Sequence, residues 1–333
     1  MTRYDCVRRR VIPLCLALGA MGGCDRGPAA PHPQDDRSPV TLPDTVDLVS
    51  FADVLRADMP GEGSGGYTPP QPAEAMAFLL AVDEALTGQA TTADSLLAAF
   101  GYDVVYAVDG TLGDSLLFVV ERTPVERGWG TYIWNTAAAV TPATVHVDHP
   151  LYDLDTPQLA AMLYVDCRCR GLYIAGTHRY ADPNDISDMA RSTSSVFQAM
   201  HEHLAVLDSV VVSVHGFAAG NHAPPTSESD AVVSNGATSG GVLGWSPAAL
   251  ALRDTLRGRG YAVGLVAYDP AYTDLTGSPN PQGRYSNDTF GYGRWVHIEL
   301  SRPVRETPES RAAMAAAVTS WLVPAFRLAT PRG

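Results

Sequence analysis

The chain has 333 residues, and 46% of them are hydrophobic, which is enough for one large core or two smaller ones. Its formal net charge is -13. An acidic surface of this kind argues against nucleic acid, or an anionic membrane face, as a partner.

The first 23 residues are typical of an export signal. Arg8, Arg9 and Arg10 precede an apolar run over residues 11–21, which is shorter than the roughly 20 residues of a membrane-spanning helix. Small residues then precede Cys24, and this order resembles a bacterial lipoprotein signal with Cys24 as the lipidated N-terminus. Plain signal-peptidase cleavage is the alternative. Removing residues 1–23, with four Arg and one Asp, takes the net charge from -13 to -16. We expect an exported protein that is lipid-anchored in the bacterial cell envelope and faces the periplasm or the exterior.

Residues 24–45 are rich in Pro, Asp and Ser, and we expect a flexible tether there. Residues 46–101 form a predicted helical N-terminal extension. Within it, apolar spacing predicts helices over 73–86 and 92–100. In the folded part, Cys167 and Cys169 are interpreted as two half-buried thiols, because a bond between residues two apart closes a strained ring.

From residue 102 onward the pattern changes to short β-prone runs and then to alternating strands and helices, as in βαβ units. We therefore predict an α/β domain over 102–330, with a central mixed and largely parallel sheet flanked by helices. The predicted strands are 104–108, 116–120, 131–134, 143–147, 172–175, 209–214, 262–267 and 295–300, and the predicted helices are 156–164, 187–206, 247–257 and 307–326.

Polar or titratable side chains follow four of these strands, where ligands bind in sheets of this class. They are His149, the pair His178-Arg179, His215, and the pair Tyr268-Asp269. Two His and one carboxylate leave a coordination position open on a tetrahedral zinc ion. His149, Asp153 and His215 are the candidate ligands. Asp153 has a second interpretation as a helix cap.

His146 and Asp148 share one face of their strand and are rival ligands. Glu299 lies in the strand Trp295–Leu300 and is the candidate general base. A plain salt bridge from Glu299 to Arg302 or Arg305 is the alternative.

Arg179 suits capture of a substrate carboxylate, and an ordinary pair with Asp182, Asp185 or Asp188 is the alternative. His201 and His203, two apart on a helix, are interpreted as a solvated face. His215-Gly216 also fits the oxyanion loop of a serine hydrolase. The nearest nucleophile motif, around Ser246, places Pro247 where a backbone N–H is needed, which disfavours that alternative.

Four motifs stand out in chain order: His146-Val-Asp-His-Pro-Leu-Tyr-Asp153, Ala175-Gly-Thr-His-Arg179, Ser213-Val-His-Gly216 and His297-Ile-Glu-Leu-Ser-Arg302. Taken together, they resemble the N-formylglutamate amidohydrolase-like and zinc-carboxypeptidase-like hydrolases. The resemblance covers residues 128–328 and implies one zinc ion held by His149, Asp153 and His215, with Glu299 as the base and Arg179 as the substrate anchor. The chain departs from the carboxypeptidase pattern in two ways: the gap before the acidic ligand is longer and this ligand is an Asp, and an Asn-Arg pair for a terminal carboxylate is not evident.

The sequence thus predicts an exported zinc-dependent hydrolase of an amide bond in a peptide, a cell-wall peptide or an N-acyl amino acid. The substrate is expected to carry an acidic group that is bound by Arg179, with His178, Arg302 and Arg305 as further candidates. The long polar loops 218–241 and 273–293 are expected to shape the cleft. The rival hypothesis is a non-catalytic, lipid-anchored envelope binding protein on the same fold.

Overall fold

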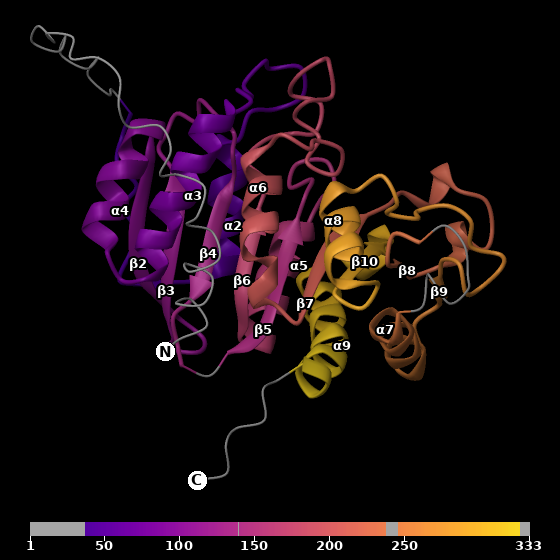
Figure 1. The fold of residues 1–333 in the computed structure, drawn as a ribbon. Helices are drawn as coiled ribbons and strands as arrows, with labels where there is room; N and C mark the ends of the chain where they lie inside the picture. The colour runs from indigo at the N-terminus through magenta and orange to yellow at the C-terminus, as the bar shows by residue number, and fades with distance from the viewer. Residues whose placement is uncertain (1–36, 139, 238–245, 327–333) are drawn as a thin grey trace, which may run out of the picture.

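The computed structural model describes residues 37–138, 140–237 and 246–326 (Figure 1). The predicted signal, Cys24 and most of the tether lie outside these residues. Within the described part of the chain, none of the helices combines the length and the hydrophobicity needed to cross a bilayer.

A mixed sheet runs through the described residues in the order β1-β2-β3-β4-β6-β5-β7-β10-β8-β9 (Figure 1). Its centre, β6-β5-β7-β10, is parallel throughout, and antiparallel pairs flank it on both sides. The carboxyl ends of these four strands therefore meet at one edge of the sheet. The strands are β1 (Thr45–Val46), β2 (Tyr102–Asp109), β3 (Ser115–Glu121), β4 (Thr131–Asn135), β5 (Thr141–Val147), β6 (Cys169–Ile174), β7 (Val210–Gly216), β8 (Ala231–Ser234), β9 (Val263–Leu265) and β10 (Trp295–Leu300).

Helices cover both faces of the sheet, so every residue of β5 is buried, as expected for a central parallel strand. One face carries α2 (Leu48–Asp58), α5 (Thr156–Cys167), α7 (Pro247–Gly258) and α9 (Pro308–Phe326). The other carries α3 (Pro72–Leu86), α4 (Ala90–Leu97), α6 (Val196–Leu204) and α8 (Pro281–Phe290). This arrangement confirms the predicted α/β class.

The segment predicted as a helical extension contributes to the main fold. Thr45–Val46 adds a parallel edge strand beside β2, and α2 packs on α5, with Phe51 edge-on to Phe118 at 5.3 Å between ring centroids. On the other face, Phe78 of α3 meets Tyr102 edge-on at 5.0 Å. The N-terminal helices thus bury apolar side chains on both faces of one sheet.

Three predicted elements differ from the structure. The helix predicted over 187–206 begins only at Val196, where the side chain of Ser195 accepts a hydrogen bond from the backbone N–H of Gln198. The preceding polar residues form turns. The loops predicted over 218–241 and 273–293 contain β8 and α8, respectively. Helix α8 is polar overall, and its small Gly283 lies against Trp295, where a Cβ would come within 2.7 Å of the indole.

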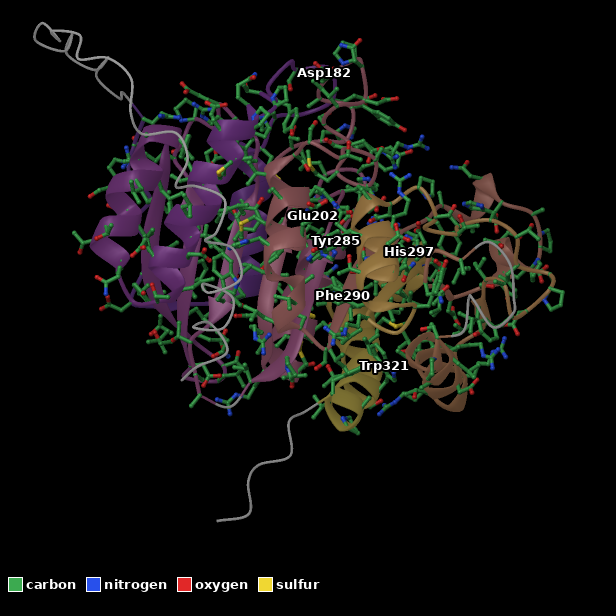
Figure 2. All side chains as sticks on the ribbon, viewed as in Figure 1. Asp182, Glu202, Tyr285, Phe290, His297 and Trp321 are labelled. Carbon is green, nitrogen blue, oxygen red and sulfur yellow. A yellow bond between two sulfur atoms is a disulfide. The ribbon has the colours of Figure 1, made fainter. Side chains whose placement is uncertain are left out.

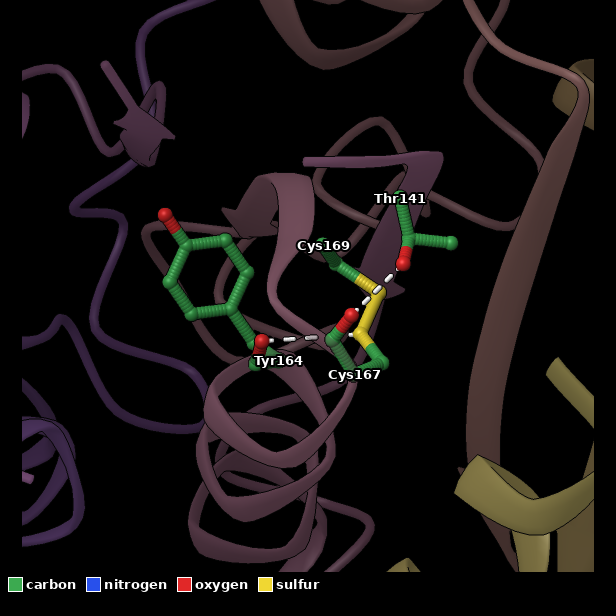
Figure 3. Close-up of a disulfide and its surroundings, with 4 residues drawn as sticks. All are labelled: Thr141, Tyr164, Cys167 and Cys169. Atoms are coloured by element: carbon green, nitrogen blue, oxygen red, sulfur yellow. Dashed lines mark hydrogen bonds between the residues drawn. A yellow bond between two sulfur atoms is a disulfide. The ribbon is translucent and has the colours of Figure 1, made fainter. Parts of the chain in front are cut away.

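The prediction of two half-buried thiols is wrong, because Cys167 and Cys169 form a disulfide and both are buried (Figure 3). Cys167 ends α5 and Cys169 begins β6. Between them, Arg168 adopts a left-handed conformation with φ 49°. This turn brings the two Cα atoms to 5.1 Å, within the range that a disulfide spans.

Candidate metal centre and its cleft

The three predicted ligands converge at the carboxyl edge of the parallel strands. His149 lies two residues beyond β5, and His215 is the penultimate residue of β7. Asp153 is brought back toward His149 by a turn in which its backbone N–H donates to the carbonyl of His149 at 2.9 Å. All three side chains are buried.

The spacing of the ligand atoms fits a tetrahedral ion. Oδ2 of Asp153 lies 3.2 Å from Nδ1 of His149 and 3.1 Å from Nδ1 of His215. Around zinc, with bonds of about 2.0–2.1 Å to nitrogen and oxygen, tetrahedral neighbours stand roughly 3.3 Å apart. One carboxylate oxygen and two imidazole nitrogens are therefore spaced as a metal ion could require.

The outward nitrogen of each imidazole is held by a second carboxylate. Nε2 of His149 lies 2.8 Å from Oδ1 of Asp188. Nε2 of His215 lies 3.3 Å from Oδ2 of Asp148 and 3.1 Å from the hydroxyl of Ser213. Such partners fix the tautomer and the orientation of metal-binding histidines. Both rings thus present Nδ1 to the same point.

The rival ligands do not reach this point. Asp148 is buried behind His215, and its Oδ2 accepts a hydrogen bond of 2.7 Å from the side-chain amide of Asn280. His146 lies deeper, stacked on Tyr173 at 5.1 Å and edge-on to Phe197. Asp148 is therefore placed as a partner of a ligand, and His146 as part of the core.

Glu299 stands opposite His215 in the register of β10 and β7. Its side chain is 12% exposed, and Oε1 lies 3.5 Å from Nε2 of His297. Figure 2 labels His297, which lies on β10 beside α8. Within the described residues, neither Arg302 nor Arg305 forms an ion pair with Glu299. The carboxylate therefore stays available at the edge of the ligand set.

Buried charges tune this group of residues. Burial alone would lower the pKa of His149 and His215, but Asp153 and Asp188 raise the pKa of His149, and Asp148 and Asp153 raise that of His215. Burial would raise the pKa of Asp153, and the two imidazoles instead lower it. Burial raises the pKa of Glu299 to about 7, against the opposing effect of His215. A carboxylate with that pKa can both accept and return a proton near neutral pH.

Arg179 forms the ordinary ion pair that was the alternative to substrate binding. Its Nη2 lies 2.5 Å from Oδ2 of Asp188, and the guanidinium lies over the rings of Tyr152 and Tyr180, at 5.1 Å from each centroid. Asp188 in turn holds His149. Arg179 is therefore connected to the metal centre through a carboxylate while it also lines the cleft. The neighbouring His178 is buried, and its Nδ1 accepts from the backbone N–H of Tyr180.

Arg305 joins three loops of the site. Its guanidinium donates to the carbonyls of Leu300, the last residue of β10, and of Phe217 and Leu154, which follow β7 and β5. It crosses the Cα of Gly216 so closely that a Cβ there would come within 2.5 Å of it. Arg302 pairs with Asp155 and Glu306.

A cavity of about 450 Å³ opens beside the candidate ligands, and a second of about 270 Å³ adjoins it. His149, His215, Glu299, Arg179 and Leu275 line both cavities. The predicted cleft-shaping loops contribute to the larger one through Ala218, Asn221, His222 and Leu275. The ligand set is thus accessible from a cleft large enough for a small organic substrate.

No protein-family profile and no curated protein matches the chain. Solved structures do match. They include a gene product of Agrobacterium tumefaciens (14% identity, TM-score 0.40, covering 56% of this chain and 90% of that one) and the N-formylglutamate amidohydrolase of Ralstonia eutropha JMP134 (15%, 0.36, 56% and 93%). A third is the metallo-carboxypeptidase of Pseudomonas aeruginosa in complex with (2-guanidinoethylmercapto)succinic acid (12%, 0.37, 78% and 69%). The matched structures thus include both groups of hydrolases that the motifs resemble. Similarity of this degree does not assign a reaction.

Other predicted site features lie elsewhere or have other roles. Strand β9 runs antiparallel to the central four, so Tyr268 and Asp269 lie at the opposite edge of the sheet, where Asp269 pairs with Arg253 and Arg257. Ser246 is buried, and its hydroxyl accepts from the backbone N–H of Ala249 at the start of α7, which is a capping role.

The predicted solvated face of α6 is wrong for His201. This residue is buried, and its Nε2 lies 3.0 Å from the hydroxyl of Ser286 on α8. His203 does lie nearer the surface and pairs with Asp83.

Sequence reasoning missed the residues that orient the ligands. Asp188 was recognised only as a possible partner of Arg179, and Asn280 was assigned to a loop. The cluster of aspartates directly after His178-Arg179 was the available signal for Asp188. Asn280 carried no signal beyond its place before Pro281, where its side chain caps α8.

Proposed function

We propose that this chain is a zinc-dependent hydrolase that cleaves an amide bond. The observation that carries the proposal is the convergence of Nδ1 of His149, Nδ1 of His215 and Oδ2 of Asp153, with both outward imidazole nitrogens held by further carboxylates. Three protein ligands leave one position of a tetrahedral ion open, which is the arrangement of catalytic zinc sites.

Zinc held there would polarise the scissile carbonyl and make a water molecule acidic enough to attack near neutral pH. Glu299 would accept the proton of that water, since its carboxylate borders the ligand set and its pKa is near 7.

The substrate would be a peptide, a cell-wall peptide or an N-acyl amino acid that bears an acidic group. Arg179, Arg302 and Arg305 line the larger cavity and would attract the acidic group of the substrate. His178, next to Arg179, is a further candidate contact for that group. The net charge of -13 disfavours polyanionic substrates.

Export and lipid anchoring through Cys24 belong to the same proposal. The disulfide between Cys167 and Cys169 supports it, because such bonds persist in oxidising compartments. A Cys24→Ser variant expressed in a bacterial host should lose incorporation of labelled palmitate and leave the membrane fraction. Equal labelling of both forms would contradict the assignment of Cys24.

Zinc analysis tests the centre of the proposal. The purified protein should contain about one zinc ion per chain, and His149→Ala should remove it. His203→Ala is the matched control, because this histidine also pairs with an aspartate but lies on α6 away from the cleft. A stable wild type that takes up no zinc would instead support the non-catalytic envelope binding protein.

Glu299→Gln separates catalysis from metal binding. The variant should keep its zinc and lose turnover by about 10²–10⁴-fold, the usual contribution of a general base. The assay is a screen of peptide and N-acyl amino acid libraries with the wild type, followed by the variant on each substrate found. Unchanged turnover would show that another group takes the proton.

A further inference from the structure

A second histidine–carboxylate pair lies at the same cleft as the candidate ligands. His222 lines the larger cavity, and its Nδ1 lies 2.7 Å from Oδ2 of Asp274. The other oxygen of Asp274 accepts a hydrogen bond of 2.6 Å from the hydroxyl of the buried Thr226. The carboxylate is thus fixed on one side by a hydroxyl and on the other by the imidazole.

The imidazole of His222 also packs against an aromatic ring. Phe217, two residues after His215, meets it edge-on at 5.5 Å between ring centroids. With Nδ1 bound to Asp274, chemistry at this ring is left to Nε2, and no hydrogen bond to Nε2 is present within the described residues. The His222 side chain is 17% exposed and reaches solvent through the cleft that it lines.

The backbone that carries Asp274 is unusual. Leu275 adopts a left-handed conformation with φ 53° and itself lines both cavities. A left-handed leucine costs free energy, and such residues persist where the surroundings impose them, often at active sites. The loop therefore accepts strain at the residue next to the carboxylate that orients His222.

We propose that His222 is a further catalytic residue of the hydrolase, with Asp274 as its positioning residue, and that it donates a proton to the leaving nitrogen. The inference rests on the proposed function. An imidazole whose Nδ1 is bound by a carboxylate is held in one orientation, so that its Nε2 is the nitrogen presented to a substrate. A proton donor needs such a fixed position within reach of the leaving group.

The reaction balances with these two groups. Water oxygen bonds to the carbonyl carbon while Glu299 takes one proton from the water. The bond from carbon to nitrogen then breaks, its electron pair stays on nitrogen, and Nε2 of His222 supplies the proton that completes the amine. After the products leave, Glu299 releases its proton to solvent and His222 takes one up. The net change is one water consumed per amide cleaved.

The decisive experiment compares an amide with an ester of the same acyl group. The amide is one that the wild type cleaves, and the ester is the 4-nitrophenyl ester, whose phenolate leaves without a proton. His222→Ala should lower kcat for the amide by about 10²–10⁴-fold and should keep kcat for the ester within about threefold of the wild-type value. Asp274→Asn should show the same selectivity with a smaller loss. Equal losses on both substrates would overturn the proposal, since a merely structural role affects both alike.

His203→Ala is again the matched control and should leave both rates unchanged. A second readout does not need turnover. In the zinc-loaded protein, acetohydroxamic acid should shift the ¹⁵N resonance of Nε2 of His222, and an unmoved resonance at saturation would show that the ring does not face the bound acyl group. Loss of both rates in Glu299→Gln, together with no effect of His222→Ala, would refute only this inference. A wild type without zinc would refute the proposed function as well.

Discussion

Four buried histidines fall into two groups that differ in what surrounds their ring nitrogens. His149 and His215 have a carboxylate at both ring nitrogens. His146 and His201 lie among aromatic rings, and both nitrogens of His146, like Nδ1 of His201, have no hydrogen-bond partner within the described residues. The two groups are equally buried. The carboxylate partners, rather than burial or residue type, therefore distinguish a candidate ligand from a core histidine.

The strongest test of this comparison replaces one histidine from each group. His215→Ala removes a ligand and should weaken zinc binding by at least about 100-fold, because losing an outer partner alone costs 10–100-fold. His146→Leu should leave zinc affinity unchanged and the free energy of unfolding within about 1.5 kcal/mol of the wild type. Competition with a chromogenic chelator and urea denaturation give the two quantities. If His146→Leu lost zinc, the assignment of the two groups would be reversed.

The next test concerns the outer carboxylates. Asp188→Ala and Asp148→Ala should each weaken zinc binding by about 10–100-fold, because the imidazole then loses the partner that fixes its tautomer. Asp83→Ala, which removes the partner of His203, is the control and should leave the affinity as it is. The same chelator competition measures all three variants.

The two groups should also give the zinc-free protein opposite dependences on pH. Burial lowers the pKa of His146 to about 4, so the unfolded state binds more protons between pH 4 and about 6.5, and stability rises with pH in that window. The pKa of His149 and His215 is raised, so their contribution is complete below about pH 6.5 and is lost as pH rises through the folded-state values.

In urea denaturation of the zinc-free protein, the contributions of these two groups should therefore have slopes of opposite sign below and above about pH 6.5, with up to about 1.4 kcal/mol per pH unit for each histidine that titrates. With zinc present, the free energy of unfolding should instead rise with pH above about 6.5, because zinc binds only unprotonated imidazoles. Stability of the zinc-free protein that keeps increasing to pH 9 would contradict the raised pKa of the two ligands.

The smallest expected effect is at the hydroxyl that partners His201. Ser286→Ala removes the hydrogen bond to Nε2 and should lower the free energy of unfolding by about 1 kcal/mol. Zinc content should not change. A loss of zinc in this variant would mean that the core histidines and the metal centre are coupled.

The sequence alone was enough to predict the candidate site residues that lie at or near the ends of strands. His149, His215 and Glu299 follow or occupy strands whose apolar runs are unambiguous, and the edge at which they meet follows from parallel pairing. The residues of one strand do not reveal its direction relative to its neighbours. Asp269 was therefore predicted at the wrong edge of the sheet. Partners such as Asn280 depend on tertiary contacts across 132 residues and leave no local pattern.

Arg305 bears on how the proposed site would take up its ion. Its one guanidinium holds the carbonyls of Leu300 at the end of β10, Phe217 after β7 and Leu154 after β5, each close in the chain to Glu299, His215 or Asp153. Under the proposed function, the ligands would therefore be held in register by the protein itself, and capture of the ion would require little ordering of the chain. Folding and metal binding would then be separable events, in contrast to small zinc domains that assemble only around their ion.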